Sequence, residues 1–339
     1  MNISVIIPVY NAEKYIKKAI ESCIQFPEVK EIVVVDDGYK DKAKEVVFGL
    51  MEKYPIIKLY EHPDNENRGA GPSRNLGIEK ATQEYIAFLD ADDFFLPNRF
   101  TKDIMVLAEN PDADGCYNAI DCYFYSPAAE EYFKKHFHST LTTINTSANP
   151  TPGNLFRGRI GMIPNFGHFS LDGLTVKREC LLKNKILFPP LPVHQDTVFI
   201  LQLAHYAKLY PSQIIIPVAS RGVHEENRIT ANNAQGRLKR YNNQFLMWNL
   251  IFQWARREKL ENDILIYLEN TTNFYRLLSN PSPKSTELLG VILKKPRILF
   301  NPYYPELHSA YFGDDLFSEM FLRIRNVIVL LLKKVLNKS

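Results

Sequence analysis

The sequence lacks any run of about 20 apolar residues, which is the length that a helix needs to cross the core of a bilayer. Residues 1–9 are largely apolar, but Asn2 and Pro8 interrupt them and no small-residue cleavage site follows. We therefore expect a first β-strand there rather than a signal peptide, and no membrane-spanning helix.

Cysteine is also scarce. The four cysteines, at positions 23, 116, 122 and 180, form no Cys-x-x-Cys pair and show no zinc-type spacing. We expect them to be reduced, and the protein to be cytoplasmic.

Strong net charge and repeats are missing too. A formal charge of +3 is too small to indicate a nucleic-acid partner. With 45% hydrophobic and 23% charged residues, the composition is that of a globular protein, and no internal repeat or low-complexity segment occurs.

The first 110 residues alternate β-rich apolar runs with helical patterns. The expected strands are 3–10, 32–35, 56–60 and 85–90, and Asn11 is expected to cap a helix over 12–24. This alternation predicts an α/β fold with a doubly wound, mostly parallel, Rossmann-like sheet.

Three carboxylates follow the last of these strands, at Asp90, Asp92 and Asp93. Carboxylates this close together are costly unless they are exposed or a cation joins them, and their oxygens suit Mg²⁺ or Mn²⁺. The segment is therefore a candidate metal-diphosphate site. The alternative is a solvated acidic turn in which Asp93 caps a helix from Leu96.

Further polar residues follow the other expected strands. Tyr10 follows the first, and Asp36 and Asp37 follow the second. Ligands of such sheets gather at the carboxyl ends of the strands, so we expect these side chains to converge with the acids after residue 89. The convergence favours a ligand site over a solvated turn.

The later chain is less regular. A loop-rich stretch covers 139–168, and we expect long loops of this kind to be functional or mobile. A strand is expected over 214–218, and Asp196 is expected to cap a helix over 197–206. From residue 231 onward the pattern is helical.

Motifs in five places over about the first 230 residues resemble the family 2 glycosyltransferases, the large inverting group with the A-type glycosyltransferase fold. The motifs are Pro8-Val9-Tyr10-Asn11 with Glu13 and Tyr15; Val35-Asp36-Asp37-Gly38 with Asp41; Asn67-Arg68-Gly69 with Ser73-Arg74-Asn75-Leu76-Gly77; Phe88-Leu89-Asp90-Ala91-Asp92-Asp93; and His194-Gln195-Asp196 with Arg221-Gly222-Val223-His224 and Asn227. The chain departs from the family at Tyr39, where a serine is usual, and at Gln195, where a Glu-Asp pair is usual.

The resemblance implies a donor site for a nucleotide diphosphate sugar, made by Pro8, Val9, Tyr10, Asn11, Glu13, Asp36, Asp37, Arg74, Asp90 and Ala91. Within it, the ring of Tyr10 would stack on the base and Asp37 would accept from a base N–H. Two alternatives stay open: Tyr10 as a plain strand-end aromatic and Arg74 as a helix-surface arginine.

The resemblance further implies Mn²⁺ or Mg²⁺ as cofactor, held by Asp92 with Asp90 and His224. Asp196 would be the general base that takes the proton of the acceptor hydroxyl. A loop position with no metal is the alternative for His224.

The function implied is transfer of a sugar, from a UDP-sugar by preference, to a saccharide or lipid-linked saccharide, as in cell-surface polysaccharide assembly. A nucleotidylyltransferase is the alternative enzyme, but it should begin with a Gly-rich basic loop where this chain has Pro8 to Asn11. The departures at Tyr39 and Gln195 leave open an inactive nucleotide-sugar-binding protein.

The expected organisation is a catalytic domain over 1–230, with a nucleotide-sugar half (1–110) and an acceptor half (111–230). A helical accessory region over 231–315 and a basic amphipathic helix over 316–339 follow. That last helix would attach the protein peripherally to the inner face of a membrane, or pack on the accessory region or a second subunit.

Overall fold

The computed structural model describes residues 1–38, 40–63, 65–137, 139–225, 236–280, 284–294, 298–299 and 322–327. The chain divides into two compact units, Met1–Ala231 and Asn232–Ser339. The motif residues all lie in the first unit.

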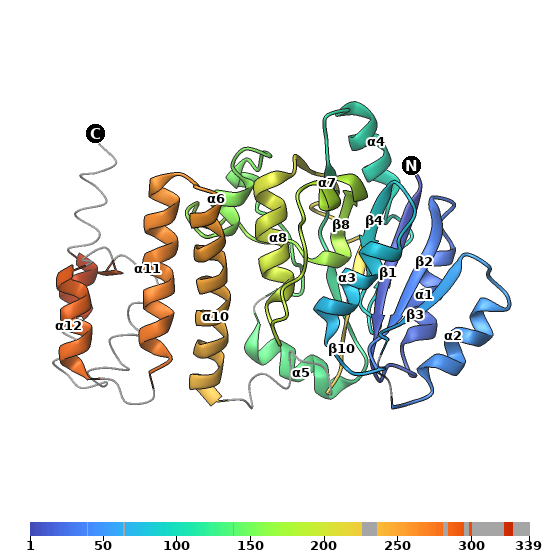
Figure 1. The fold of residues 1–339 in the computed structure, drawn as a ribbon, viewed down its shortest axis with the longest axis horizontal. Helices are drawn as coiled ribbons and strands as arrows, with labels where there is room; N and C mark the ends of the chain where they lie inside the picture. The colour runs from blue at the N-terminus through green and yellow to red at the C-terminus, as the bar shows by residue number, and fades with distance from the viewer. Residues whose placement is uncertain are drawn as a thin grey trace. The chain divides into compact units, whose positions relative to one another are not determined.

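A seven-stranded sheet in the order β3-β2-β1-β4-β8-β6-β9 forms the centre of the first unit (Figure 1). Its strands are β1 (Ile3–Val9), β2 (Val29–Asp36), β3 (Ile57–Glu61), β4 (Tyr85–Phe88), β8 (Leu174–Lys177), β6 (Gly115–Tyr117) and β9 (Leu209–Pro211). The first four strands run parallel, whereas β8 is antiparallel to both β4 and β6. The predicted fold class, a doubly wound and mostly parallel sheet, is confirmed.

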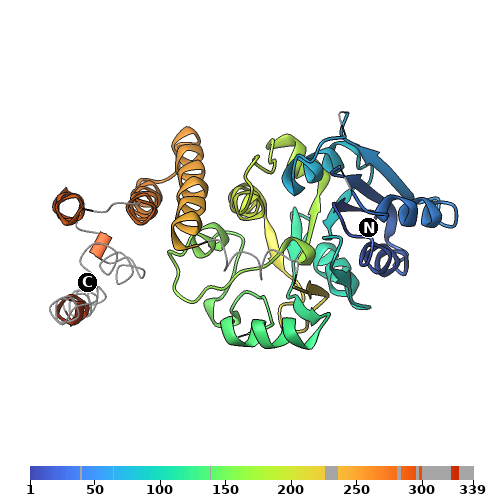
Figure 2. The same ribbon diagram turned by 90° about the horizontal axis from the view of Figure 1, so that it is seen from below.

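Helices cover both faces of this sheet. Alternate residues of β1, from Ile3 to Val9, share one buried core with α1 (Ile16–Ile24) and α2 (Ala43–Met51). On the other face α3 (Ala70–Lys80) approaches β1 so closely that a Cβ at Gly77 would meet Ile6 Cγ2 at 2.3 Å. Figure 2 shows the first strands between α3 on one side and α1 on the other. With both faces covered, only the strand ends remain open to a ligand.

Pro8 occupies the penultimate position of β1. The pairing of β1 with β4 ends at Ile6, so the N–H that Pro8 lacks falls beyond that ladder.

A second sheet of three short strands, in the order β5-β10-β7, lies beyond the acidic turn. It consists of β5 (Phe94–Phe95), β10 (Ala219–Val223) and β7 (Asp121–Phe124). Because β5 directly follows Asp92 and Asp93, its antiparallel pairing with β10 brings residues more than 120 positions apart to the same place.

Several predicted elements differ from the observed ones. The first helix begins at Ile16, four residues later than expected. The strand expected over 214–218 is absent: β10 begins at Ala219, and Ile215 and Ile216 are exposed. The apolar run predicted a strand from composition alone. Val218 has backbone hydrogen bonds to Ala119 and Leu96, but the exposed Ile215 and Ile216 belong to no described strand.

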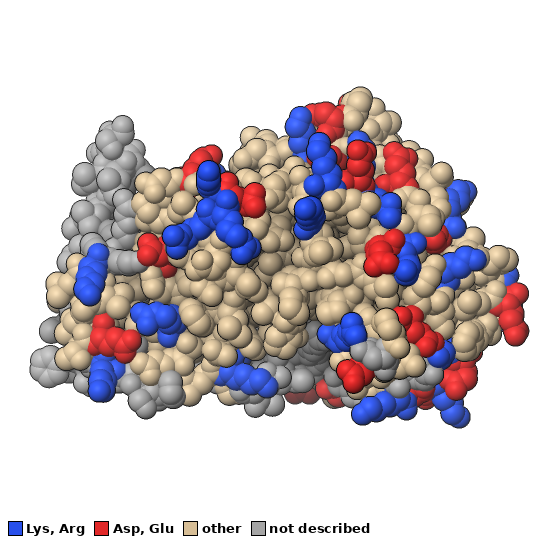
Figure 3. Space-filling model, in the orientation of Figure 1, with Lys and Arg blue, Asp and Glu red and all other residues tan. Residues whose placement is uncertain are grey.

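The remaining helices of the first unit are α4 (Thr101–Glu109), α5 (Pro127–His136), α6 (Leu155–Arg159), α7 (Arg178–Lys183) and α8 (Gln195–Tyr206). The loop-rich stretch over 139–168 is ordered around α6 and an isolated bridge between Ile144 and Gly167. On the face drawn in Figure 3, basic and acidic side chains are interspersed over the described residues.

The second unit contains α10 (Gly236–Arg257), α11 (Asn262–Leu278) and α12 (Ser285–Lys294). Of the C-terminal segment predicted as an amphipathic helix, residues 322–327 are helical and the rest lies outside the described residues. Leu322 packs against the core around Phe274 and Leu288, and Arg325 Nε donates to the Leu299 carbonyl at 2.8 Å. None of the helices in the described part of the chain has the length and apolar composition of a membrane span.

Candidate active site

The acidic turn after β4 lies at the carboxyl end of the parallel strands. It closes through a hydrogen bond from Asp93 N to Asp90 O at 3.0 Å. The side chains of Asp90 and Asp92 are 43% and 31% exposed, whereas Ala91 and Asp93 are buried. Only the first and third residues of the turn therefore present oxygens to a ligand.

Asp93 is not the helix cap that the alternative interpretation required, because α4 begins at Thr101 after Phe100. Its Oδ1 accepts from Gly222 N at 2.8 Å, across the second sheet. Burial and the neighbouring Asp172 raise the pKa of Asp93 well above its usual value. Burial and Asp90 raise the pKa of Asp172 to about 6, and Arg221 opposes both shifts. The two carboxyls form a buried pair beside one arginine.

His224 contacts Asp92, as expected if its motif and the acidic turn form one site. Its Nε2 is 3.2 Å from Asp92 Oδ2, and its ring stacks on Tyr15 with centroids 4.6 Å apart. Tyr125 donates its hydroxyl to Asp92 O at 3.3 Å. Gly222 permits this approach, since a Cβ there would lie 2.1 Å from Asp92 O.

Arg74 reaches Asp90 from α3. Its Nη2 donates to Asp90 Oδ1, and its side chain is only 4% exposed. Nε and Nη1 are buried and have no partner among the described residues. The interpretation of Arg74 as a helix-surface arginine is therefore wrong, because the guanidinium is buried beside Asp90 and two of its nitrogens lack a hydrogen-bond partner among the described residues.

The loop after β1 is tied to the loop after β2. Asn11, at φ +51°, accepts from Lys40 N at 2.8 Å through Oδ1 instead of capping α1, whose N-cap is Tyr15. Glu13 Oε2 accepts from Lys42 N at 2.9 Å. Tyr10 is 42% exposed, so its ring is open to a ligand. Asn11 and Glu13 thus hold the two loops together and leave the Tyr10 ring accessible.

Both acids of the second motif are buried at the end of β2. Asp36 Oδ1 accepts from Gly38 N at 3.0 Å. Asp37 Oδ1 accepts from Arg68 N at 2.8 Å and from Ser73 Oγ at 3.0 Å, and Oδ2 accepts from Gly69 N at 2.9 Å. Asp37 therefore anchors the chain that leads into α3.

Asp196 lies in the first turn of α8 and is exposed. The predicted cap is wrong in detail, because His194, at φ +63°, is the N-cap and Gln195 begins the helix. Asp196 lies near Arg74 and Arg159, since its negative charge opposes the lowering of the pKa that burial causes in both. Gln195 is buried, and its Oε1 has no hydrogen-bond partner among the described residues.

Asp172 was not predicted as a site residue, and it lies in a short 3-10 turn before β8. Its Oδ1 accepts from Asp90 N at 3.3 Å. Because β8 runs antiparallel to β4, its first residues lie beside the last residues of β4. Only an Asp-Gly pair before an apolar run marks this place in the sequence, and the strand direction could not be predicted from it. Tyr39 and Asn227 of the motifs lie outside the described residues.

The acids fit a divalent cation. Oxygens of Asp90, Asp93 and Asp172 all lie within 4.8 Å of one another, so this cluster shares only Asp90 with the predicted ligand set of Asp92, Asp90 and His224. Carboxylate oxygens are the ligands that Mg²⁺ and Mn²⁺ prefer. Burial first, and the neighbouring carboxylates second, raise the pKa of Asp93 and of Asp172, and a bound cation would oppose both effects.

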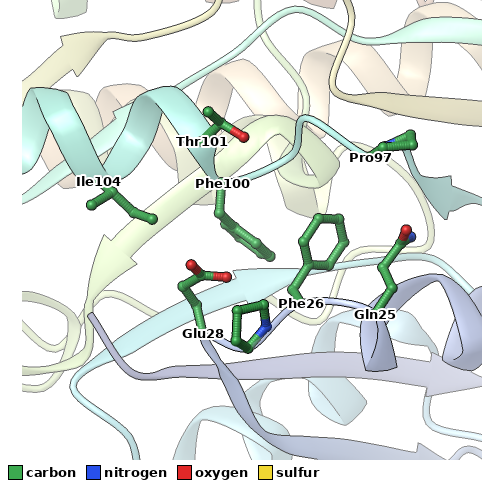
Figure 4. Close-up of a pocket in the computed structure, with 8 residues that line it drawn as sticks. Gln25, Phe26, Glu28, Pro97, Phe100, Thr101 and Ile104 are labelled. Carbon is green, nitrogen blue, oxygen red and sulfur yellow. The ribbon is translucent and has the colours of Figure 1, made fainter.

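A cavity of about 380 Å³ lies elsewhere, between the turn before β2 and the start of α4 (Figure 4). Phe26, Phe100 and Ile104 line it, with Glu28 at its side. It is at the amino end of β2, the opposite edge from Asp36, so it is separate from the acidic turn.

Known proteins resemble this chain in sequence. Residues 4–166 match the model of the family described as Glycosyl transferase family 2. YibD of Escherichia coli, named an uncharacterized glycosyltransferase, is 39% identical over 203 residues, which cover 58% of this chain and 54% of YibD. An uncharacterized glycosyltransferase of Rickettsia felis is 41% identical over 304 residues, which cover 86% of this chain and 45% of the relative. The chain thus spans about half the length of these relatives.

The fold is similar to that of S. aureus TarS, with a TM-score of 0.56 at 20% identity, covering 91% of this chain and 48% of TarS. A TarS structure of residues 1–349 in complex with UDP-GlcNAc gives a TM-score of 0.55. The match of residues 4–166 and the motifs that the structure assembles agree, so this part of the chain is similar to glycosyl transferase family 2.

Proposed function

We propose that this protein is a metal-dependent inverting glycosyltransferase that moves a sugar from a UDP-sugar to a hydroxyl of a saccharide or lipid-linked saccharide. The observation that supports it most is the buried Arg74 guanidinium beside Asp90, with two nitrogens that no described residue satisfies. A diphosphate supplies acceptor oxygens for such a group, and arginine is the side chain best shaped to bind them.

The cation would be held by Asp92, Asp90 and His224. Asp90 and Asp92 are the exposed acids of the turn, so a donor can reach their oxygens, whereas Asp93 and Asp172 are buried behind them. A bound Mn²⁺ or Mg²⁺ supplies charge neutralisation for the leaving diphosphate. The buried pair of Asp93 and Asp172 supports the turn, because Asp93 accepts from Gly222 N and Asp172 accepts from Asp90 N.

The nucleoside would lie over the joined loops after β1 and β2. The exposed ring of Tyr10 offers a stacking surface, and Pro8 and Val9 end the strand beneath it. Asp37 Oδ2 accepts one hydrogen bond from the protein and retains a lone pair for a base N–H. Support for a uridine donor comes from the similar fold of TarS, whose structure holds UDP-GlcNAc.

Asp196 would be the general base. As the acceptor oxygen bonds to the anomeric carbon, its proton passes to the Asp196 carboxylate while the bond to the diphosphate breaks on the opposite face. Arg74 and Arg159 lie near Asp196. Their positive charges attract its carboxylate and would hold it beside the donor. Gln195 is buried behind it and adds no second negative charge.

The test is a panel of nucleotide sugars incubated with the protein and a mixture of saccharide acceptors, with and without Mn²⁺. Metal-dependent release of a nucleoside diphosphate from one donor, with sugar added to an acceptor, is the expected result. Tight donor binding with no transfer to any acceptor would favour an inactive binding protein.

A further inference from the structure

A buried hydrogen-bonded chain joins His62, Ser73 and Asp37. His62 Nε2 lies 3.0 Å from Ser73 Oγ, and Ser73 Oγ lies 3.0 Å from Asp37 Oδ1. All three side chains are buried. His62 follows β3, Asp37 follows β2 and Ser73 belongs to α3, so the chain connects three separate elements.

The hydrogen bonds from His62 to Ser73 and from Ser73 to Asp37 have a definite order of donor and acceptor. Ser73 Oγ has two possible acceptors, Asp37 Oδ1 at 3.0 Å and the Gly69 carbonyl oxygen at 3.2 Å. Its single hydroxyl hydrogen is best used toward the carboxylate, because bonds to a charged acceptor are the stronger ones. The oxygen of Ser73 is then left to accept, so His62 donates through Nε2. His62 thus fixes the rotamer of the Ser73 hydroxyl, which in turn holds one oxygen of Asp37.

Asp37 caps a helix that has no cap of its own. The N-cap of α3 is Gly69, at φ +89°, which offers no side chain. Asp37 accepts from Gly69 N and Arg68 N, so a carboxylate from β2 satisfies the amino end of α3 and favours its dipole. The residue after Ser73 is Arg74, whose guanidinium reaches Asp90.

We propose that His62 is a positioning residue of the donor site, which acts through Ser73 and Asp37. It sets the amino end of α3, and with it the positions of Asp37 on the nucleoside side and Arg74 on the diphosphate side. This inference rests on the proposed function, because it assumes that both residues contact the donor.

The experiment compares the affinity of purified variants for UDP and GDP in the presence of Mn²⁺, by calorimetric titration. His62→Leu removes the donor of the chain, whereas His62→Gln keeps an amide N–H at a similar reach. A matched control is Thr175→Val, which breaks a buried hydrogen bond of the same kind, from Thr175 Oγ1 to Asp103 Oδ2 at 2.7 Å. Thermal melts of all three measure the loss of stability.

We expect His62→Leu to weaken binding of the preferred nucleotide about tenfold and His62→Gln by less than about threefold. Thr175→Val should lower the melting temperature with unchanged nucleotide affinity. If His62→Leu lowers the melting temperature like the control and binds nucleotide as the wild type does, His62 is merely structural and the inference is overturned. If the wild type binds neither nucleotide, the proposed function and this inference both fall.

Discussion

At the residue scale, replacing one carboxylate oxygen of Asp196 with nitrogen tests whether this residue is a general base or only part of the first turn of α8. Asp196→Asn keeps the shape of the side chain but cannot take a proton, so turnover should fall by about 10²- to 10⁴-fold with donor affinity nearly unchanged. Steady-state kinetics and nucleotide titration give the two quantities. Because His194 is the N-cap, the melting temperature should change little. A weaker donor affinity with full turnover would make Asp196 a donor ligand.

Substitutions at Asp92 and Asp172 distinguish a proposed metal ligand from an acid that supports the ligands. Asp92→Asn should nearly abolish turnover and Mn²⁺-dependent nucleotide binding, because Asp92 is exposed and would contact the cation. Asp172→Asn should retain part of both, since it keeps the polar contact with Asp90 N. Activity and Mn²⁺ titration measure the difference. Full activity of the wild type in millimolar chelator would contradict metal dependence.

The raised pKa of Asp172 predicts a pH dependence of stability. A free Asp has a pKa of about 3.9, so between about pH 4 and 6 the unfolded chain loses its proton while the folded protein keeps it. The metal-free protein should therefore lose stability as the pH rises through this window, by at most about 1.4 kcal/mol per pH unit. Urea unfolding at several pH values measures this slope, and Asp172→Asn should remove this contribution.

At the scale of elements, the second sheet joins the acidic turn to β10. A methyl group at Gly222 would meet the backbone oxygen of Asp92, which cannot move without shifting the turn. Gly222→Ala should therefore reduce the free energy of unfolding by about 1–3 kcal/mol and weaken Mn²⁺ binding. Denaturant unfolding and metal titration are the measurements.

Gly49→Ala is the matched control for this prediction. Gly49 lies inside α2, and a methyl group added there would meet nothing within 4 Å, so alanine should stabilise the helix by about 0.5–1 kcal/mol. Equal effects of the two substitutions would show that Gly222 has no special steric role.

At the scale of the whole molecule, the C-terminal segment is the part of the chain predicted to attach to a membrane. Part of it, Leu322 and Arg325, contacts the core of the second unit, which favours packing over insertion for those residues. The basic residues after 330 lie outside the described part of the chain. We predict that the full chain pellets with anionic liposomes at low salt more than a chain ending at Ser318 does. Equal pelleting of both, or none, would contradict peripheral membrane attachment.

Local patterns in the sequence were sufficient for the parallel half of the sheet and for the acids at its edge. The strands β2 and β4 are apolar runs, and acids follow each of them closely in the sequence, so both features are local. The resemblance added Arg74 and His224, which the structure places against Asp90 and Asp92.

Only the tertiary structure decided which carboxylates are exposed and which are buried. Asp172 joins the site because β8 runs antiparallel to β4, and His224 does so because β10 pairs with β5. The helix caps expected at Asn11 and Asp196 were also wrong. The side chain of Asn11 binds the backbone of a distant loop, and α8 begins two residues earlier than expected, at Gln195. Strand direction and contacts across the chain depend on the packing of distant segments, which short-range sequence patterns do not encode.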